Sequence, residues 1–225
     1  MRIIDQSVKV LYPGTLEQAK NELRLIEYAG RNCYDSFGKI TDESYKQFIE
    51  NLRKREHESP LEFGHITFEI VTSRDVMAEI TRHRIASFAI RSQRYVDESK
   101  TGDIEFIEPL FYKDTPDDED HPYSDPVFAA SMTWRDQMEN IEESYKSMRA
   151  IGLRNEDARK VLPNSTVTKI IMKVNLRELL HIYKLRSANS AYPEMRELMN
   201  LLKIEVDKVL PGFLPEKEDH NASGQ

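Results

Sequence analysis

The chain has 225 residues, of which 39% are hydrophobic and 32% charged, enough apolar material for a sizeable core in a globular protein. Its formal net charge of -7 disfavours a general nucleic-acid binder, so any anion site has to be local. No stretch approaches the roughly 18 apolar residues of a membrane span, and the start lacks the apolar core of a signal peptide. With one cysteine and six scattered histidines, neither an internal disulfide nor a zinc site is expected. We therefore expect a cytoplasmic protein.

The first third of the chain predicts strands and helices in alternation. Residues 7–14, SVKVLYPG, indicate a strand that ends in a Pro-Gly turn. An apolar stripe at helical spacing predicts a helix over residues 15–33, and a second helix is expected over residues 42–55. The alternation in GHITFEIVTS, residues 64–73, indicates a strand with one buried face. Ser73 is then expected to cap a helix that runs to about residue 84.

The second half begins with an acidic, Pro-rich stretch at residues 112–126, which we interpret as a surface loop or insertion. A long amphipathic helix is predicted over residues 126–150. Residues 164–175, NSTVTKIIMKVN, fit either a strand or a helix, because threonine and valine are interleaved with an apolar run.

The C-terminal elements carry clearer signals. Asn175, followed three residues later by Glu178, is typical of a capping box and predicts a helix to about residue 187. A last helix is expected over residues 193–210, before a Pro-Gly pair. The tail, residues 215–225, is expected to be disordered.

Positive charge is concentrated in residues 81–95, TRHRIASFAIRSQRY, which hold four arginines and one histidine but no acid. Arginine forks bind phosphate bidentately, so this stretch fits an anion site as well as it fits an ordinary solvated face. On the expected helix from Ser73, Glu79 shares a face with Arg82 and His83. That spacing allows a surface ion pair between Glu79 and Arg82.

Other polar residues have simple structural roles available to them. Arg159 fits a solvated helix end, and Arg186 in a last helical turn would complement the helix dipole. On the predicted helix after Asn175, Arg177 and His181 form one polar stripe. His57 lies before a Ser-Pro pair and fits a helix cap better than a catalyst. The glycines are scattered, without the glycine-rich loop of a Rossmann dinucleotide domain.

Taken together, several segments resemble the flavin-dependent thymidylate synthases. The signature is Arg82-His83-Arg84, then seven residues, then Ser92. HESPLEF precedes it, and ARKVLP and VNLRELLHIYKLR follow it, so the resemblance covers roughly residues 57–186. It implies an α/β fold of the α+β type, with an antiparallel-rich sheet flanked by helices and no Rossmann unit. We expect one such domain over residues 1–214.

The resemblance also implies a reaction and an assembly. Members convert dUMP to dTMP, with 5,10-methylenetetrahydrofolate as the one-carbon donor, FAD as the hydride carrier and NADPH as the reductant of the flavin. They are homotetramers whose active sites lie between subunits. Neither nucleic acid nor a membrane is an expected partner.

Carried over position by position, the resemblance assigns two sets of residues. The flavin set is His57, Ser59, Arg82, His83, Arg84, Ile90, Asn175, Leu176, Arg177 and His181. The dUMP set is Glu79, Ile80, Thr81, Arg82, Ile90, Arg91, Ser92, Gln93, Arg94, Arg159 and Arg186. Arg186 matches the family arginine that is proposed to activate the pyrimidine. The chain departs from the family at Ile90, where members often carry Glu or Gln, so only a backbone contact is expected there.

Two side chains are candidate nucleophiles, and we expect neither to bond covalently to the substrate. Cys33 is expected to be a buried structural cysteine. Ser92 has only arginines as close neighbours in the sequence and no general base, so it is assigned to hydrogen bonding of dUMP. Two other classes of function stay open on the sequence: a nucleic-acid-binding module, and a flavin-binding oxidoreductase with another substrate.

Overall fold

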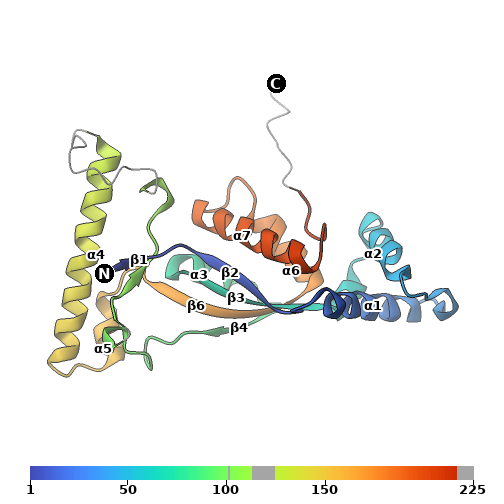
Figure 1. Ribbon diagram of the computed structural model, residues 1–225, viewed down its shortest axis with the longest axis horizontal. Helices are drawn as coiled ribbons and strands as arrows, with labels where there is room; N and C mark the ends of the chain where they lie inside the picture. The colour runs from blue at the N-terminus through green and yellow to red at the C-terminus, as the bar shows by residue number, and fades with distance from the viewer. Residues whose placement is uncertain (101, 113–124, 217–225) are drawn as a thin grey trace. The chain divides into compact units, whose positions relative to one another are not determined.

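The computed structural model describes residues 1–100, 102–112 and 125–216 (Figure 1). Most of the predicted acidic loop at residues 112–126 and of the predicted tail at residues 215–225 therefore lies outside the described residues. Within the described ranges, each helix is too short or too polar to cross a membrane.

The chain forms two compact units, and the boundary between them falls inside strands. Unit 1 consists of Met1–Ser7, Ile70–Arg82 and Ala89–Ile170. Unit 2 consists of Val8–Glu69, His83–Phe88 and Ile171–Gln225. The expectation of a single domain over residues 1–214 stays a prediction, because a division into compact units does not show which parts fold independently.

The main sheet has four strands, which are antiparallel and lie in the order β2-β3-β6-β4. Their bounds are Ser7–Tyr12 for β2, His65–Ser73 for β3, Ala86–Ile90 for β4 and Val167–Asn175 for β6. A separate parallel pair is formed by β1, Arg2–Ile3, and β5, Glu105–Phe106. The expected antiparallel-rich sheet flanked by helices is confirmed.

Side-chain alternation explains the two long strands. In β3, Ile66, Phe68 and Ile70 are fully buried while the residues between them are partly exposed, as a strand with one core face requires. In β6, buried Ile170 and Met172 alternate with Ile171 and exposed Lys173. Residues 164–175 are thus mainly a strand. The basic segment contains a strand that was not predicted, β4.

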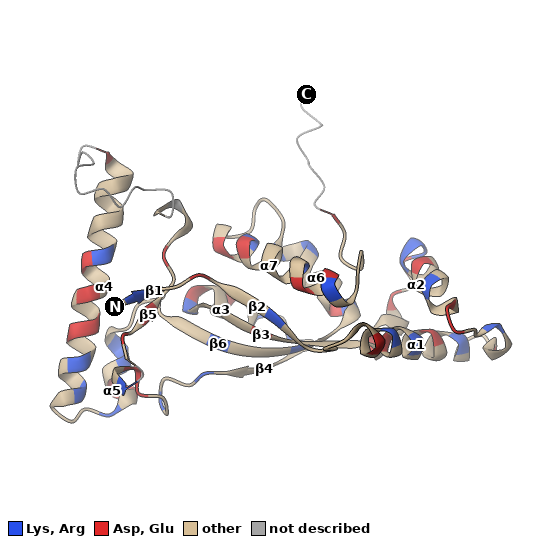
Figure 2. Ribbon diagram, in the orientation of Figure 1, with Lys and Arg blue, Asp and Glu red and all other residues tan. Residues whose placement is uncertain are grey.

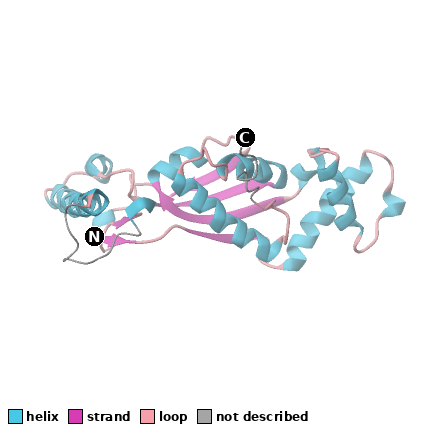
Figure 3. Cartoon of the chain, turned by 90° about the horizontal axis from the view of Figure 1, so that it is seen from above, coloured by secondary structure: helices cyan, strands magenta, loops and turns pink. Residues whose placement is uncertain are grey.

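The described part of unit 2 has four α-helices: α1, Leu16–Asn32, α2, Ser44–Lys54, α6, Leu176–Arg186, and α7, Pro193–Val209. These confirm the predicted helices, and the 3-10 helices η1, Phe37–Lys39, and η2, Ser59–Phe63, lie between them in the chain. Asn175 caps α6 as expected, and the structure adds Thr15 as the cap of α1. Each side chain accepts a hydrogen bond from a backbone amide of the first turn. Helices α6 and α7 form a layer over the strand segments of this unit (Figures 1 and 3).

The helices of unit 1 are α3, Arg74–Ile80, α4, Pro126–Ala150, and α5, Asn155–Ala158, with short 3-10 turns η3, Glu98–Lys100, η4, Leu110–Tyr112, and η5, Arg159–Val161. Acidic and basic residues are interspersed along α4 (Figure 2). On its inner face, Met138 and Tyr145 join Ile104, Phe106 and Ala158 in an apolar cluster.

The prediction of a helix from Ser73 to about residue 84 was wrong at its C-terminal end. Helix α3 ends at Ile80, and the hydroxyl of Thr81 donates to the carbonyl of Met77 at 2.8 Å. The chain then leaves the helix and enters β4 at Ala86. Arg82 and His83 are therefore not on the helix that carries Glu79, and the expected shared face does not exist.

Candidate functional site

In unit 1, the end of the basic segment forms a tight turn. The carbonyl of Ser92 accepts from the amide of Val96 at 2.9 Å, and the hydroxyl of Ser92 accepts from the amide of Arg94 at 3.2 Å. The amide of Arg91 donates to the carbonyl of Lys169 in β6 at 2.9 Å. The turn is thus tied to the sheet, and it fixes the positions of Ser92 and Arg94.

Arginines from separate segments of unit 1 gather around one buried carboxylate. Arg91 donates to Glu98 at 2.6 Å, and Glu98 is 5% exposed. Burial raises the pKa of Glu98 above its ordinary value, while Arg91 and Arg74 oppose that shift. Burial also lowers the pKa of Arg74, and the guanidinium of Arg159 adds to the effect. Arg74, Arg91 and Arg159 outnumber Glu98, and the charge of nearby Asp97 is matched by its pair with Arg149. The region is therefore positive, which favours an anionic ligand.

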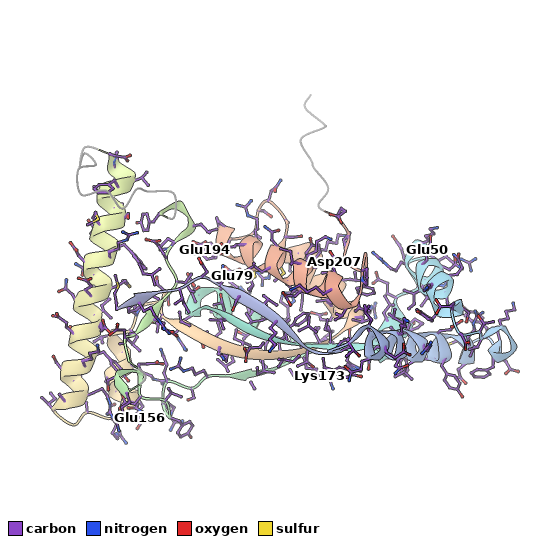
Figure 4. The ribbon with its side chains drawn as sticks, viewed as in Figure 1. Glu50, Glu79, Glu156, Lys173, Glu194 and Asp207 are labelled. Carbon is purple, nitrogen blue, oxygen red and sulfur yellow. The ribbon has the colours of Figure 1, made fainter. Side chains whose placement is uncertain are left out.

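Other residues of the predicted dUMP set surround the same turn. Arg94 pairs with Glu156 at 3.2 Å, and its carbonyl accepts from Asn155. Glu156 lies on α5 (Figure 4). Gln93 is 7% exposed, and its side-chain nitrogen has no hydrogen-bond partner within the described part of the chain. Ile90 ends β4 and is 39% exposed. The predicted dUMP residues from Ile90 to Arg94 therefore lie together, at the end of β4 and in the turn that follows it.

The remaining members of the dUMP set in unit 1 lie at the end of α3. Ile80 is fully buried, so its side chain contributes to the core and only its backbone is available to a ligand. Thr81 uses its hydroxyl within the helix end, whereas Arg82 is exposed. Glu79 has intermediate exposure. Of these four residues, Arg82 offers the most accessible charged group.

In unit 2, a buried histidine connects an acid and a base. Atom Nδ1 of His83 lies 3.2 Å from Oε1 of Glu178, and Nε2 of His83 accepts from Nε of Arg186 at 3.1 Å. The ring of His181 meets that of His83 edge-on, with 5.8 Å between centroids. Burial is the main cause that lowers the pKa of His83, and Arg186 and His181 lower it further while Glu178 opposes them. His83 is therefore favoured in its neutral form.

The start of α6 is attached to η2 in the same unit. The amide of Leu176 donates to the carbonyl of Gly64 at 2.9 Å. The guanidinium of Arg177 pairs with Glu62 at 2.6 Å and approaches Glu58 at 3.7 Å. His57 and Ser59, which flank Glu58 in the chain, are thereby brought near Arg177.

The donor groups of unit 2 suit a flavin dinucleotide. Arg84 and Arg177 are exposed guanidinium groups, which bind the oxygens of a pyrophosphate well. His57 and Ser59 are also exposed and offer further hydrogen bonds. Asn175 uses its side-chain oxygen to cap α6, so its amide nitrogen is the group left for a ligand. The predicted flavin residues of this unit thus fit an anionic cofactor.

His83 also belongs to a group of side chains that could hold a metal ion. The ligand atoms of His83, Glu178 and His181 all lie within 4.8 Å of one another. Sequence spacing did not indicate this group, because His83 is far from α6 in the chain. The guanidinium of Arg186 already bonds to His83, and a fixed cation beside the group disfavours a second one.

Sequence reasoning missed three participants, and its expectation for Cys33 was wrong. The sequence did not indicate that Arg74, Glu98 or Glu178 belongs to a site, because each acquires that role from a partner on another segment. The capping-box pattern pointed to Glu178 only as part of a helix start. Cys33 is exposed rather than buried, because it follows the last turn of α1.

The fold and these two groups of residues define a mixed α/β protein that concentrates arginines where anionic ligands would bind. Residues 15–212 match the family described as thymidylate synthase complementing protein. The chain belongs to this family.

Individual relatives agree with that assignment. The chain is 30% identical to a flavin-dependent thymidylate synthase of Clostridium tetani, with 88% of this chain and 83% of the relative covered. It is 34% identical to a probable flavin-dependent thymidylate synthase of Mycobacterium phage L5, with 83% and 77% covered. In fold it is similar to the crystal structure of the UMP/dUMP methylase PolB from Streptomyces cacaoi bound with 5-Br dUMP. That similarity has a TM-score of 0.71 at 22% identity over 95% of each chain.

Proposed function

We propose that this protein is a flavin-dependent thymidylate synthase. It would methylate dUMP to dTMP, taking the carbon from 5,10-methylenetetrahydrofolate and reducing equivalents from NADPH through FAD. The observation that carries the proposal is the guanidinium of Arg186, which is held by a neutral, buried histidine in a chain of this family. A fixed cation of this kind is what a pyrimidine needs when it gains negative charge.

The substrate would be bound through its phosphate and its base. Arg94, Arg159 and the backbone amides near Ser92 are the proposed phosphate ligands, because the surrounding arginines make this part of unit 1 positive. Arg186 would lie against N3 and O2 of the uracil and favour its N3-deprotonated form, which makes C5 more nucleophilic.

The flavin would be held by the exposed arginines and by the start of α6. Arg82, Arg84 and Arg177 suit its pyrophosphate, while His57, Ser59, Asn175, Leu176 and His181 supply the remaining contacts. When bound, FAD supplies hydride chemistry that side chains cannot perform. The residues of this chain would bind and orient the flavin and the substrate and would exclude water from the site.

The assembly is proposed to be a homotetramer with active sites shared between subunits. Unit 2 supports this with a cavity of about 1460 Å³ beside α1 and α2. Leu16, Leu23 and Ile49 are among its lining residues. An apolar hollow of this size on a single chain is consistent with a surface that a neighbouring subunit covers.

The experiment is to purify the protein, load it with FAD, and measure dTMP formation with dUMP, methylenetetrahydrofolate and NADPH. Arg186→Ala should lower turnover by about 100- to 1000-fold while most of the flavin stays bound. Arg177→Ala should lose flavin first, and Lys173→Ala, at an exposed lysine of β6, is the matched control. A folded protein that takes up no FAD would contradict the proposal. If the rate of flavin reduction by NADPH does not depend on dUMP, the protein is an oxidoreductase with another substrate.

A further inference from the structure

The carboxylate of Glu178 has an unusual position for a residue in the first turn of a helix. The backbone amide of Glu178 donates to the side-chain oxygen of Asn175, the cap residue, at 2.8 Å. In a capping box the carboxylate would turn back to the cap residue. Here it instead faces the ring of His83, and Glu178 is only 9% exposed. A buried carboxylate is costly unless a partner compensates it, so the contact with His83 has to be a specific one.

The hydrogen bonds decide which nitrogen of His83 carries the proton. Nε of an arginine is always a donor, so Nε2 of His83, which lies 3.1 Å from Nε of Arg186, must offer a lone pair. The proton of the neutral ring is then on Nδ1, which lies 3.2 Å from the Glu178 carboxylate and donates to it. Glu178 and Arg186 therefore stabilise the same tautomer from opposite sides of the ring.

We propose that Glu178 is a positioning residue, which fixes the tautomer of His83 and through it the orientation of Arg186. The inference rests on the proposed function, since that function gives Arg186 its role at the pyrimidine. Without Glu178, the proton of His83 is free to move to Nε2. An Nε2–H group would face the Nε–H of Arg186, and the guanidinium would have to turn away.

Other groups around the ring are consistent with this role. Glu178 lies in the first turn of α6, where the helix dipole favours a negative charge. His181 is one turn further along the same helix and touches the ring by its edge. Glu178, His181 and Arg186 are the charged or titratable groups that act on His83.

The first test is made on the intact wild-type network, and a substitution is used only to assign the His83 signal. The holoenzyme, labelled with ¹⁵N at its six histidines, is examined by NMR, and His83 is assigned by the signal lost in His83→Gln. We expect a neutral ring with the proton on Nδ1. A proton on Nε2 in the wild type overturns the proposal, whether or not the protein makes dTMP.

The second test compares substitutions at Glu178. Glu178→Ala should lower kcat by on the order of 100-fold, because a displacement of about 1 Å in a positioned group costs that much, while KM for dUMP changes far less. Glu178→Gln keeps an oxygen that can accept from Nδ1–H, so it should recover most of kcat. It also removes a charge that holds up the pKa of His83, so the acid limb of the rate profile should move to lower pH.

The matched control is Glu27→Gln, at a carboxylate of unit 2 that is 1% exposed and pairs with Arg31. It removes a buried charge from α1 and should leave the acid limb in place.

If kcat of Glu178→Ala equals that of the wild type, Glu178 has no positioning role. If the isolated wild type holds stoichiometric zinc and loses activity with a chelator, the group is a metal site and the proposal is wrong. A wild type that makes no dTMP contradicts the proposed function, and the tautomer measurement still decides the role of Glu178.

Discussion

At the scale of single residues, the surroundings of Cys33 and Ser92 indicate whether either side chain could act as a nucleophile. Cys33 is exposed at the end of α1, and its thiol lies 3.8 Å from the carbonyl of Ala29. The hydroxyl of Ser92 is used inside the turn that holds Arg94. Neither arrangement supplies the adjacent base that an oxygen or sulfur nucleophile needs.

We therefore expect Cys33→Ala to keep most of the activity. Ser92→Ala should raise KM for dUMP by about fivefold, since a hydrogen bond contributes about 1 kcal/mol. Steady-state kinetics of both variants measure this, and intact mass of the wild type with dUMP tests for a covalent adduct. A stable pyrimidine adduct on either residue, with an inactive variant at that position, would contradict the expected non-covalent role.

The pair of Asp97 and Arg149 in unit 1 allows a prediction about pH. The guanidinium donates from Nη2 at 2.8 Å and from Nε at 3.1 Å, and this holds the pKa of Asp97 at about 2, below its ordinary value of 3.8. A carboxyl whose pKa is depressed by folding adds stability above its unfolded pKa and loses it as pH falls through its folded pKa. The contribution is therefore complete near neutral pH and declines between 3.8 and about 2.

Asp97→Asn should thus lower the free energy of unfolding by about 2 kcal/mol near neutral pH, and by less as the solution becomes more acidic. Urea denaturation at several pH values measures the difference. Asp103→Asn is the control, because Asp103 is 61% exposed and its contact with Lys146 is long, at 3.6 Å. A difference between Asp97→Asn and wild type that stays constant down to low pH would show that the pair does not act through charge.

At the scale of elements, unit 2 depends on the close approach of α1, η2 and α6. Gly64 follows η2, and a methyl group there would lie 2.6 Å from Cδ1 of Ile26 and 3.1 Å from Cδ1 of Leu176. Both of those side chains are fully buried. Glycine is required at this position by packing and not by its backbone conformation, since φ is -89°.

Gly64→Ala should therefore lower the free energy of unfolding by about 1–3 kcal/mol, the usual cost of overpacking a core. Thermal denaturation at fixed protein concentration measures the change. Gly38→Ala is the matched control, because a methyl group there meets no described atom within 4 Å. Equal stability of the two variants would mean that the junction relaxes without cost.

At the scale of the whole molecule, the proposed tetramer would place the apolar cavity of unit 2 in an interface between subunits. Leu16 lines this cavity and is 55% exposed, whereas Leu25 on the same helix is 47% exposed and is not among the lining residues. A charge at Leu16 would disturb an interface there without disturbing the core of the chain.

The wild type should accordingly show a mass well above the 26.3 kDa of one chain in light scattering. Leu16→Glu should shift the protein toward smaller species and lower its activity, while Leu25→Glu should do neither. A wild-type monomer with full activity would contradict the shared active sites, and an unchanged Leu16→Glu tetramer would place the interface elsewhere.

By itself the sequence determined much of the secondary structure. Hydrophobic periodicity and capping patterns are local properties of the sequence, so α1, α2, α4, β3, the cap at Asn175 and the start of α6 could be predicted. The basic segment and the order of its neighbours also indicated the family that residues 15–212 match. These features depend on residues close together in the chain, where spacing alone carries the physical information.

The tertiary structure decided what those residues do to one another. Helix α3 ends at Ile80, before the predicted end, and the chain continues into a strand of the sheet at Ala86. Glu98 is enclosed by arginines, and Glu178 bonds to a histidine 95 residues away. Such charges and tautomers depend on burial and on partners from distant segments, and these distances are set only when the chain folds.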